Sequence, residues 1–223
     1  MKKCLLCEES LSYQLSLQEL FLMKREEEWL CESCRIRFEK VGNEVCSSCC
    51  KKGQKGMCED CTTWKKNGKE VCHRALYYYN EEMKDYFRRY KFQGDQLLGY
   101  LFAKEIYLEL KKYKGYSIVP IPLSQERKEK RGFNQVTAML DFANLPYCQL
   151  LKKRDTQAQS QKNRKERLEL KQSFDLINHQ TDLSDLKIIL VDDIYTTGAT
   201  IERAKEILNG KGVKEIKSFS LAR

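Results

Sequence analysis

The chain of 223 residues contains only three prolines and two histidines, and it has no long apolar run. Without about 18 consecutive apolar residues, no membrane-spanning helix is expected. The lysine-led N-terminus enters a cysteine pair rather than the apolar core of a signal peptide. We therefore expect a cytoplasmic protein without membrane insertion.

The two histidines, His73 and His179, stand apart from other candidate ligands. We expect neither to be a metal ligand or a general base.

Internal repeats are also lacking, apart from recurring cysteine pairs. A hydrophobic content of 41% with twelve tyrosines excludes global disorder and supports a packed core. The length suits one ordinary domain with a smaller one attached. We expect a cysteine-rich module over residues 1–72 and a larger domain over residues 73–223.

Cysteine is distributed unevenly, because ten of the eleven cysteines lie in the first 72 residues. In a secreted miniprotein this density would predict disulfides, but close pairs in a chain without a signal peptide favour metal binding. Cys50 is adjacent to an expected ligand and Cys72 stands alone, so both are left out. Cys148 is expected to be a small core residue.

Four CxxC pairs make up the cysteine-rich module, and each pair can place two thiolates at adjacent corners of a tetrahedron. We expect two structural Zn²⁺ ions, although an interleaved pairing remains open beside the sequential one. A thioredoxin-like redox motif would need a βαβ context, which is missing, and the even spacing favours zinc over iron–sulfur clusters. The expected metal ligands are Cys4, Cys7, Cys31, Cys34, Cys46, Cys49, Cys58 and Cys61.

Residues 187–200, KIILVDDIYTTGAT, form the most informative segment of the chain. An apolar strand leads into Asp192 and Asp193, whose carboxylates are acceptors suited to vicinal hydroxyls. A loop of Thr196, Thr197, Gly198, Ala199 and Thr200 then opens a helix, where free amides and hydroxyls suit a phosphate. A capped helix beside solvated acids is the simpler alternative. The order of all four parts favours a sugar-phosphate site.

Beyond residue 74, strand and helix patterns alternate along the chain, which predicts an α/β fold with a parallel, doubly wound sheet. Ligands of such sheets bind at the carboxyl ends of the strands. Strands are expected at 75–79, 117–121, 147–151, 187–191 and 216–220. Helices are expected at 81–90, 96–112, 134–142 and 201–208.

Two basic stretches accompany the phosphate-type motif. Residues 127–131 contain four cationic side chains and are expected to form a loop, and residues 152–171 carry eight Lys or Arg against three Asp or Glu. A solvated face would explain such runs, but their place beside a phosphate motif fits a polyanionic ligand better.

The 187–200 segment resembles the phosphoribosyl-pyrophosphate (PRPP) motif of type I phosphoribosyltransferases. The resemblance implies that Asp192 and Asp193 hold the ribose hydroxyls and serve catalysis, while Thr196 to Thr200 cradle the 5′-phosphate. The implied reaction attacks the anomeric carbon and expels pyrophosphate bound to Mg²⁺. A nearby carboxylate would stabilise the oxocarbenium-like transition state.

Two further segments sharpen the resemblance, namely VPIPL at 119–123 followed by RGFNQ at 131–135, and RDT at 154–156 followed by Gln159. With the cysteine pairs, they resemble the ComF family of ComFC-type competence proteins. This implies a zinc module on a phosphoribosyltransferase domain that acts in DNA uptake during natural transformation. The implied partners are PRPP, a ComFA-type DNA-translocating ATPase and single-stranded DNA. The implied pyrophosphate and flap residues are Arg127, Arg131, Arg154 and Arg167.

Two functional hypotheses follow. In the first, the domain transfers phosphoribosyl from PRPP to an acceptor that no residue identifies. In the alternative, a catalytically inert phosphoribosyltransferase fold binds single-stranded DNA or the ComFA-type ATPase. Bases could then stack on Tyr77, Tyr78, Tyr79, Tyr90 and Phe92, although a strand or helix core is the more usual place for most of them. Lys91 could reach a phosphate or simply end its helix.

Overall fold

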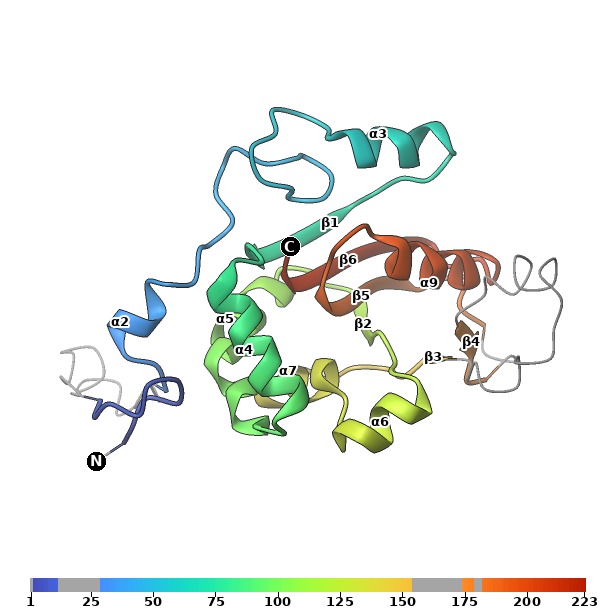
Figure 1. Ribbon diagram of the computed structural model, residues 1–223. Coiled ribbons are helices and arrows are strands. Elements are labelled where there is room, and N and C mark those ends of the chain that lie inside the picture. The colour runs from blue at the N-terminus through green and yellow to red at the C-terminus, as the bar shows by residue number, and fades with distance from the viewer. Residues whose placement is uncertain (1, 12–28, 154–173, 179–181) are drawn as a thin grey trace, which may run out of the picture.

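The computed structural model describes residues 2–11, 29–153, 174–178 and 182–223. Four parallel strands form the main sheet in the order β1, β6, β5, β2 (Figure 1). Two further strands form a small antiparallel pair. The main strands are β1 (His73–Tyr77), β2 (Tyr116–Pro120), β5 (Lys187–Ile194) and β6 (Glu215–Ala222), and the small pair is β3 (Leu151–Lys153) with β4 (Phe174–Leu176).

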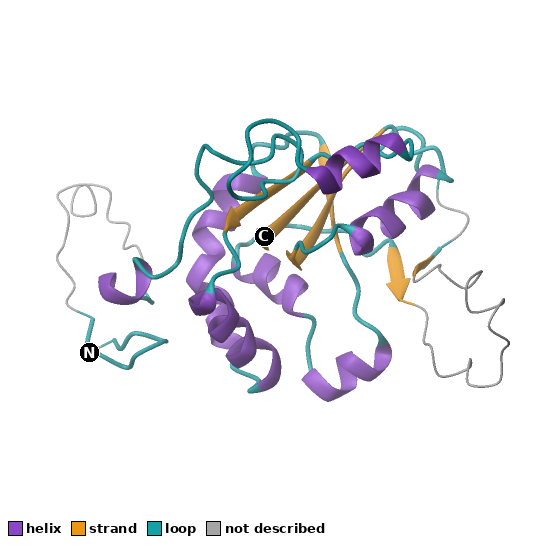
Figure 2. Cartoon of the chain, turned by 45° about the horizontal axis from the view of Figure 1, so that its top comes forward, coloured by secondary structure: helices purple, strands orange, loops and turns teal. Residues whose placement is uncertain are grey.

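Helices cover both faces of this sheet (Figure 2). Successive side chains of a strand point to opposite faces, so each strand contributes to the packing on both sides. Ile189 and Val191 of β5 pack among the helices of one face, and Ile188 and Leu190 pack against the other. The first face is covered by α4 (Glu81–Phe92), the 3₁₀ helix η1 (Gln96–Phe102), α5 (Ala103–Leu110) and α7 (Gln135–Phe142). The second is covered by α9 (Ala199–Asn209) and the β3–β4 pair. The predicted doubly wound α/β fold is confirmed.

Polar side chains begin the helices that border the carboxyl end of the sheet. Asn80 caps α4 by accepting the amide of Met83, and Asn134 caps α7 by accepting that of Val136. Ser124 caps α6 (Gln125–Arg131), which ends at Gly132 with φ of 80°. These caps determine where each helix starts, and so which of its residues reach the strand ends.

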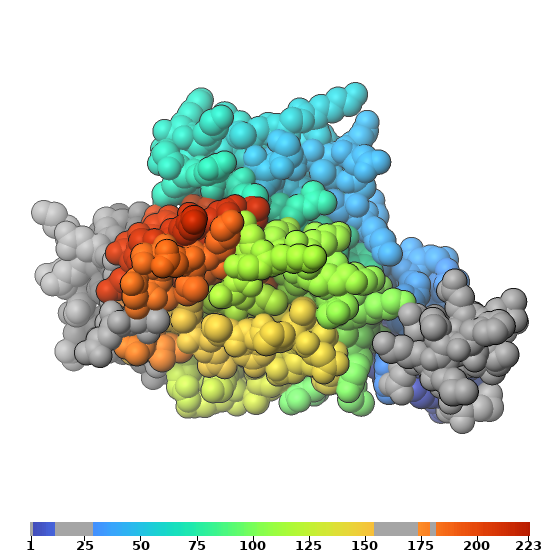
Figure 3. All heavy atoms as spheres, turned by 180° about the vertical axis from the view of Figure 1, so that it is seen from behind, coloured from blue at the N-terminus to red at the C-terminus, as the bar shows by residue number. Residues whose placement is uncertain are grey.

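The cysteine-bearing segment contains two short helices, α2 (Glu32–Arg35) and α3 (Glu59–Lys66). Cys4 and Cys34 are buried in the core that α4 and η1 share, whereas Cys46, Cys49, Cys58 and Cys61 are buried with β5 and α9. Seen from behind, the light-blue to teal atoms of the cysteine-bearing segment lie directly against red and orange atoms of the C-terminal part of the chain (Figure 3). Within the described residues, no helix is long and apolar enough to cross a bilayer.

Several sequence predictions need correction. The basic stretch 127–131 belongs to helix α6 rather than to a loop. The helix predicted over 96–112 is divided into η1 and α5, and Gly99 packs so closely that an added Cβ would lie 2.5 Å from Phe142. Residues 147–150 are not a strand, since β3 starts at Leu151. Cys148 is exposed rather than part of the core.

Candidate functional site

The two aspartates lie within the last residues of β5, not after it, so the alternation of the strand sends them to opposite faces. Asp193 lies on the α4–α7 face and is 6% exposed. Its Oδ2 atom accepts from Lys91 Nζ at 2.6 Å and from Gln135 Nε2 at 2.5 Å. Asp193 is therefore held in place from both α4 and α7, and Lys91 compensates its charge.

Asp192 occupies the other face and is half-buried. Burial, together with the neighbouring Asp193 carboxylate, raises the pKa of Asp192 to about 8. Its Oδ1 accepts the amide of Asp193 at 2.9 Å. The charge of Lys153 acts on Asp192 from β3, and burial lowers the pKa of that lysine. A ligand that stabilises the ionised form of Asp192 would lower this pKa.

The loop after β5 leads into α9 through Gly198, the N-cap of that helix, which has φ of 83°. A Cβ at this position would lie 2.2 Å from the Tyr195 hydroxyl, so only glycine fits. Thr196 and Thr197 are exposed, and Thr197 Oγ1 accepts the amide of Ala199 at 3.4 Å. Since amides in the first turn of a helix have no intrahelical partner, this loop has the form of an anion site.

The predicted pyrophosphate residues lie on α6, beside this strand end. Arg131 donates to Gln135, the same side chain that contacts Asp193. Arg127 and Arg131 both line a groove of about 670 Å³ between α4 and α6, which Lys91 also lines. The structure thus brings Arg131 to the aspartate pair through one glutamine. The predicted flap residues, Arg154 and Arg167, lie outside the described residues.

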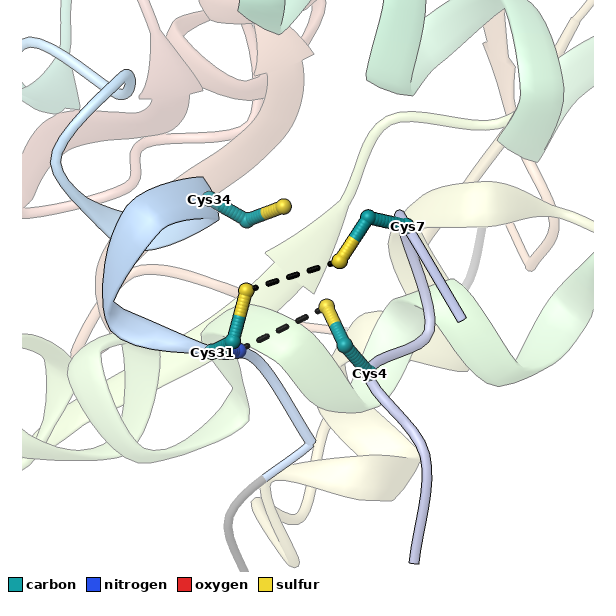
Figure 4. Close-up of side chains that lie close together, drawn as sticks. All are labelled: Cys4, Cys7, Cys31 and Cys34. Carbon is teal, nitrogen blue, oxygen red and sulfur yellow. Dashed lines mark hydrogen bonds between the residues drawn. The ribbon is translucent and has the colours of Figure 1, made fainter. Parts of the chain in front are cut away.

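All eight predicted cysteine ligands converge in two groups with the sequential pairing, Cys4/Cys7/Cys31/Cys34 and Cys46/Cys49/Cys58/Cys61. Within each group, the sulfur atoms lie within 4.8 Å of one another. Figure 4 shows the first group, with Cys7 and Cys31 sulfurs 3.5 Å apart. A tetrahedral ion with bonds of about 2.3 Å needs sulfurs about 3.8 Å apart, so both groups suit such an ion.

Basic groups and amides surround the sulfurs of each group. Cys58 N donates to Cys46 Sγ at 3.2 Å, and Cys31 N donates to Cys4 Sγ at 3.5 Å. These bonds favour thiolates, the form that binds a metal. Arg37 Nη2 donates to Cys34 Sγ of the first group at 3.1 Å.

The structure adds site residues that sequence reasoning missed. Gln135 lies inside the RGFNQ segment, and its neighbour Asn134 was expected only to begin a helix. Arg223 and Trp64 contact the phosphate-type loop, although they are remote from it in the sequence. No local motif marks them. Lys153 belongs to a recognised basic stretch, but its position near Asp192 depends on the fold.

A sequence model of the phosphoribosyl transferase domain matches residues 99–223, which include β5, both aspartates and the loop before α9. The chain therefore carries a phosphoribosyltransferase-type domain. Among solved structures, hypoxanthine phosphoribosyltransferase from Staphylococcus aureus covers 58% of this chain and 65% of its own. Its identity is 14% and its TM-score 0.34, and we draw nothing from so distant a similarity.

Two curated relatives extend over the cysteine-rich module as well. Competence protein ComFC of Streptococcus pneumoniae is 46% identical over 221 residues, covering 99% of this chain and 100% of that protein. Competence protein ComFC of Bacillus subtilis is 34% identical, covering 99% and 94%. This chain belongs to the ComF family of competence proteins.

Proposed function

We propose that this protein binds PRPP with Mg²⁺ at the carboxyl ends of β2 and β5. The single observation that carries the proposal is the continuous arrangement of Asp192, Asp193 and the loop that opens α9. The loop amides would hold the 5′-phosphate, and the Asp192 carboxylate would accept the ribose hydroxyls. Arg127 and Arg131 on α6 lie on the side where the pyrophosphate would extend, and Mg²⁺ would reduce its negative charge.

Transfer would proceed by attack of a nucleophile on the anomeric carbon while the bond to pyrophosphate breaks. Positive charge develops on the ribose in the transition state, and the ionised Asp192 would stabilise it. Asp193 is already compensated by Lys91 at 2.6 Å, so it would act mainly by orienting the strand end and its lysine. We propose this division of roles for the two aspartates.

Calorimetric titration of metal-loaded protein with PRPP and Mg²⁺ tests the proposal. We expect saturable binding in the wild type and none in the Asp192→Ala/Asp193→Ala variant. A matched control is Asp182→Ala/Asp185→Ala, which removes two carboxyl groups from the turn before β5, outside the site. Absence of binding by folded wild-type protein, or equal loss in the control, would contradict a specific PRPP site.

For the two four-cysteine groups we propose Zn²⁺, because an all-thiolate tetrahedral set is typical of structural zinc. We further propose that residues 1–72 form the zinc module of a cytoplasmic protein. Metal analysis by mass spectrometry should find two zinc ions per chain. One ion or none in protein purified without chelators would contradict this assignment.

We also propose that the groove between α4 and α6 binds single-stranded DNA during DNA uptake. Tyr79 and Phe92 line it with exposed fractions of 42% and 74%, and the Arg131 guanidinium lies 5.7 Å from the Phe92 ring centroid. Basic grooves with exposed aromatic rings suit single strands, because rings stack on bases and cations follow the phosphates. The lining cations are Lys84, Arg88, Lys91, Arg127, Lys130 and Arg131.

Fluorescence anisotropy with a labelled oligonucleotide tests this surface. Phe92→Ala should weaken binding about tenfold, in line with the loss of one stacked base. Tyr107→Ala is the matched control, since Tyr107 is 43% exposed and has the Lys111 ammonium 5.2 Å from its ring centroid on α5. An equal loss of oligonucleotide affinity in both variants would contradict DNA binding in this groove. Binding of a ComFA-type ATPase, the other proposed partner, is testable by co-purification.

A further inference from the structure

One side of the phosphate-type loop is attached to the second cysteine group, Cys46/Cys49/Cys58/Cys61. The carbonyl oxygens of Tyr195 and Thr196 accept from Arg223 Nη1, the first at 3.3 Å. The carbonyl of Thr197 accepts from the indole N–H of Trp64 at 3.2 Å. Three consecutive carbonyl groups of the loop therefore accept hydrogen bonds from residues on the side of the loop that faces this cysteine group.

Both donors belong to the surroundings of the metal-binding group. Trp64 lies on α3, which starts next to Cys58 and contains Cys61. Arg223 donates through Nε to the carbonyl of Cys49 at 3.0 Å and through Nη2 to its sulfur at 3.2 Å. Four thiolates with one Zn²⁺ carry a net charge of about −2, which favours the guanidinium at this position.

In a trans peptide, the carbonyl of one residue and the amide of the next point in opposite directions. Holding the carbonyls of residues 195–197 on the α3 side therefore directs the amides of Thr196, Thr197 and Gly198 to the other side, away from α3. These are amides of the proposed phosphate cradle. The contacts to Arg223 and Trp64 thus determine the direction in which the loop presents its donors.

The Tyr195 ring supports the loop from beneath. Its ring stacks on that of His73 with centroids 3.9 Å apart, and the Arg223 guanidinium lies 4.9 Å from its centroid. His73 is fixed by the hydroxyls of Ser218 and Ser220, each 3.0 Å from a ring nitrogen. A rigid stack therefore limits movement of the loop on this side.

We propose that Arg223 and Trp64 are positioning residues through which the metal-bound Cys46/Cys49/Cys58/Cys61 group holds the phosphate-binding loop in its binding conformation. The first cysteine group does not take part. Loss of the ion from the second group then weakens PRPP binding without any direct contact between metal and ligand. The effect on affinity rests on the proposed PRPP site, whereas the effect on loop order does not.

The test uses full-length, metal-loaded protein with two variants, Arg223→Gln and Trp64→Phe. Trp64→Phe removes one N–H donor but keeps a ring beneath Lys69, whose ammonium lies 5.0 Å from the indole. The matched controls are Arg37→Gln, which removes the arginine–sulfur contact of the first group, and Trp29→Phe, which keeps a ring against Tyr100.

Three quantities are measured for each variant: zinc content, hydrogen exchange of the 192–201 segment without ligand, and the Kd for PRPP with Mg²⁺. Exchange should rise ten- to hundredfold in Arg223→Gln, the range of hydrogen bonds to a charged group, and about threefold or more in Trp64→Phe. The Kd should rise in the same order, and neither control should change either quantity.

The proposal is overturned if Trp64→Phe, with two zinc ions retained, exchanges and binds like the wild type. It is equally overturned if the Arg37 control loosens the loop as much as Arg223→Gln does. If Arg223→Gln loses only the ion of the second group and its loop becomes disordered, the coupling is supported. If wild-type protein does not bind PRPP, the exchange data still decide the coupling, and only the proposed function fails.

Discussion

Replacing Asp192 by asparagine should stabilise the ligand-free fold while it abolishes PRPP binding. Burial and the Asp193 carboxylate raise the pKa of Asp192 to about 8, so the folded protein holds this proton more tightly than the unfolded chain. For a raised carboxyl pKa, wild-type stability falls as pH rises from about 4 to about 8. The amide cannot ionise and avoids this loss.

The magnitude follows from linkage, which allows at most about 1.4 kcal/mol per pH unit within that window. Since Asp192 is only half-buried, solvent screening reduces the effect, and we expect about 2 kcal/mol between pH 5 and pH 8. For a chain of this length, the melting temperature of the variant should exceed that of the wild type by about 4–8 °C more at pH 8 than at pH 5.

Differential scanning calorimetry of metal-loaded protein at pH 5, 6, 7 and 8 measures this difference. Asp193→Asn is the informative comparison, because it leaves Lys91, whose side chain is 14% exposed, without its partner at 2.6 Å. That variant should be destabilised by about 3 kcal/mol or more. A melting-temperature difference for Asp192→Asn that stays constant or shrinks as pH rises would refute the reasoning.

Four further predictions concern the loop, the metal groups and the core. PRPP affinity should rise between pH 7 and pH 8.5, because binding needs ionised Asp192 while phosphates with a second pKa near 6 are already ionised; a flat profile in calorimetry would contradict this. Gly198→Ala should weaken PRPP binding by more than tenfold, since the Cβ would meet Tyr195 at 2.2 Å, whereas Gly115→Ala, with φ of 79° and no atom within 4 Å, should leave the Kd unchanged. Gly99→Ala should destabilise the fold by about 1–3 kcal/mol in denaturant titration, because its Cβ would meet Phe142 at 2.5 Å. Chelation of zinc should lower the melting temperature, and full recovery on adding Zn²⁺ but not Mg²⁺ is expected from the all-cysteine donor sets.

Local sequence patterns were sufficient where a feature depends on neighbouring residues. The CxxC pairs predicted two four-cysteine groups that could hold a metal ion, and the alternation of strands and helices predicted the α/β fold. Boundaries were less reliable where packing overrides local preference. The predicted 96–112 helix is divided where the 3₁₀ geometry of η1 gives way to the α geometry of α5, and Gly99 within η1 packs closely against Phe142. The basic stretch before Gly132 is a helix, since Ser124 supplies its cap.

The sequence by itself determined the kind of chemistry, because the acid pair, the hydroxyl-rich loop and the cysteine pairs are each contiguous in the chain. Only the tertiary structure decided how these parts are arranged. The pleat of β5 separates Asp192 from Asp193, and α4 brings Lys91 to only one of them. Arg223 and Trp64 reach the loop from positions 27 and 133 residues away. Contacts over such separations form only when strands and helices pack, so no local pattern can encode them.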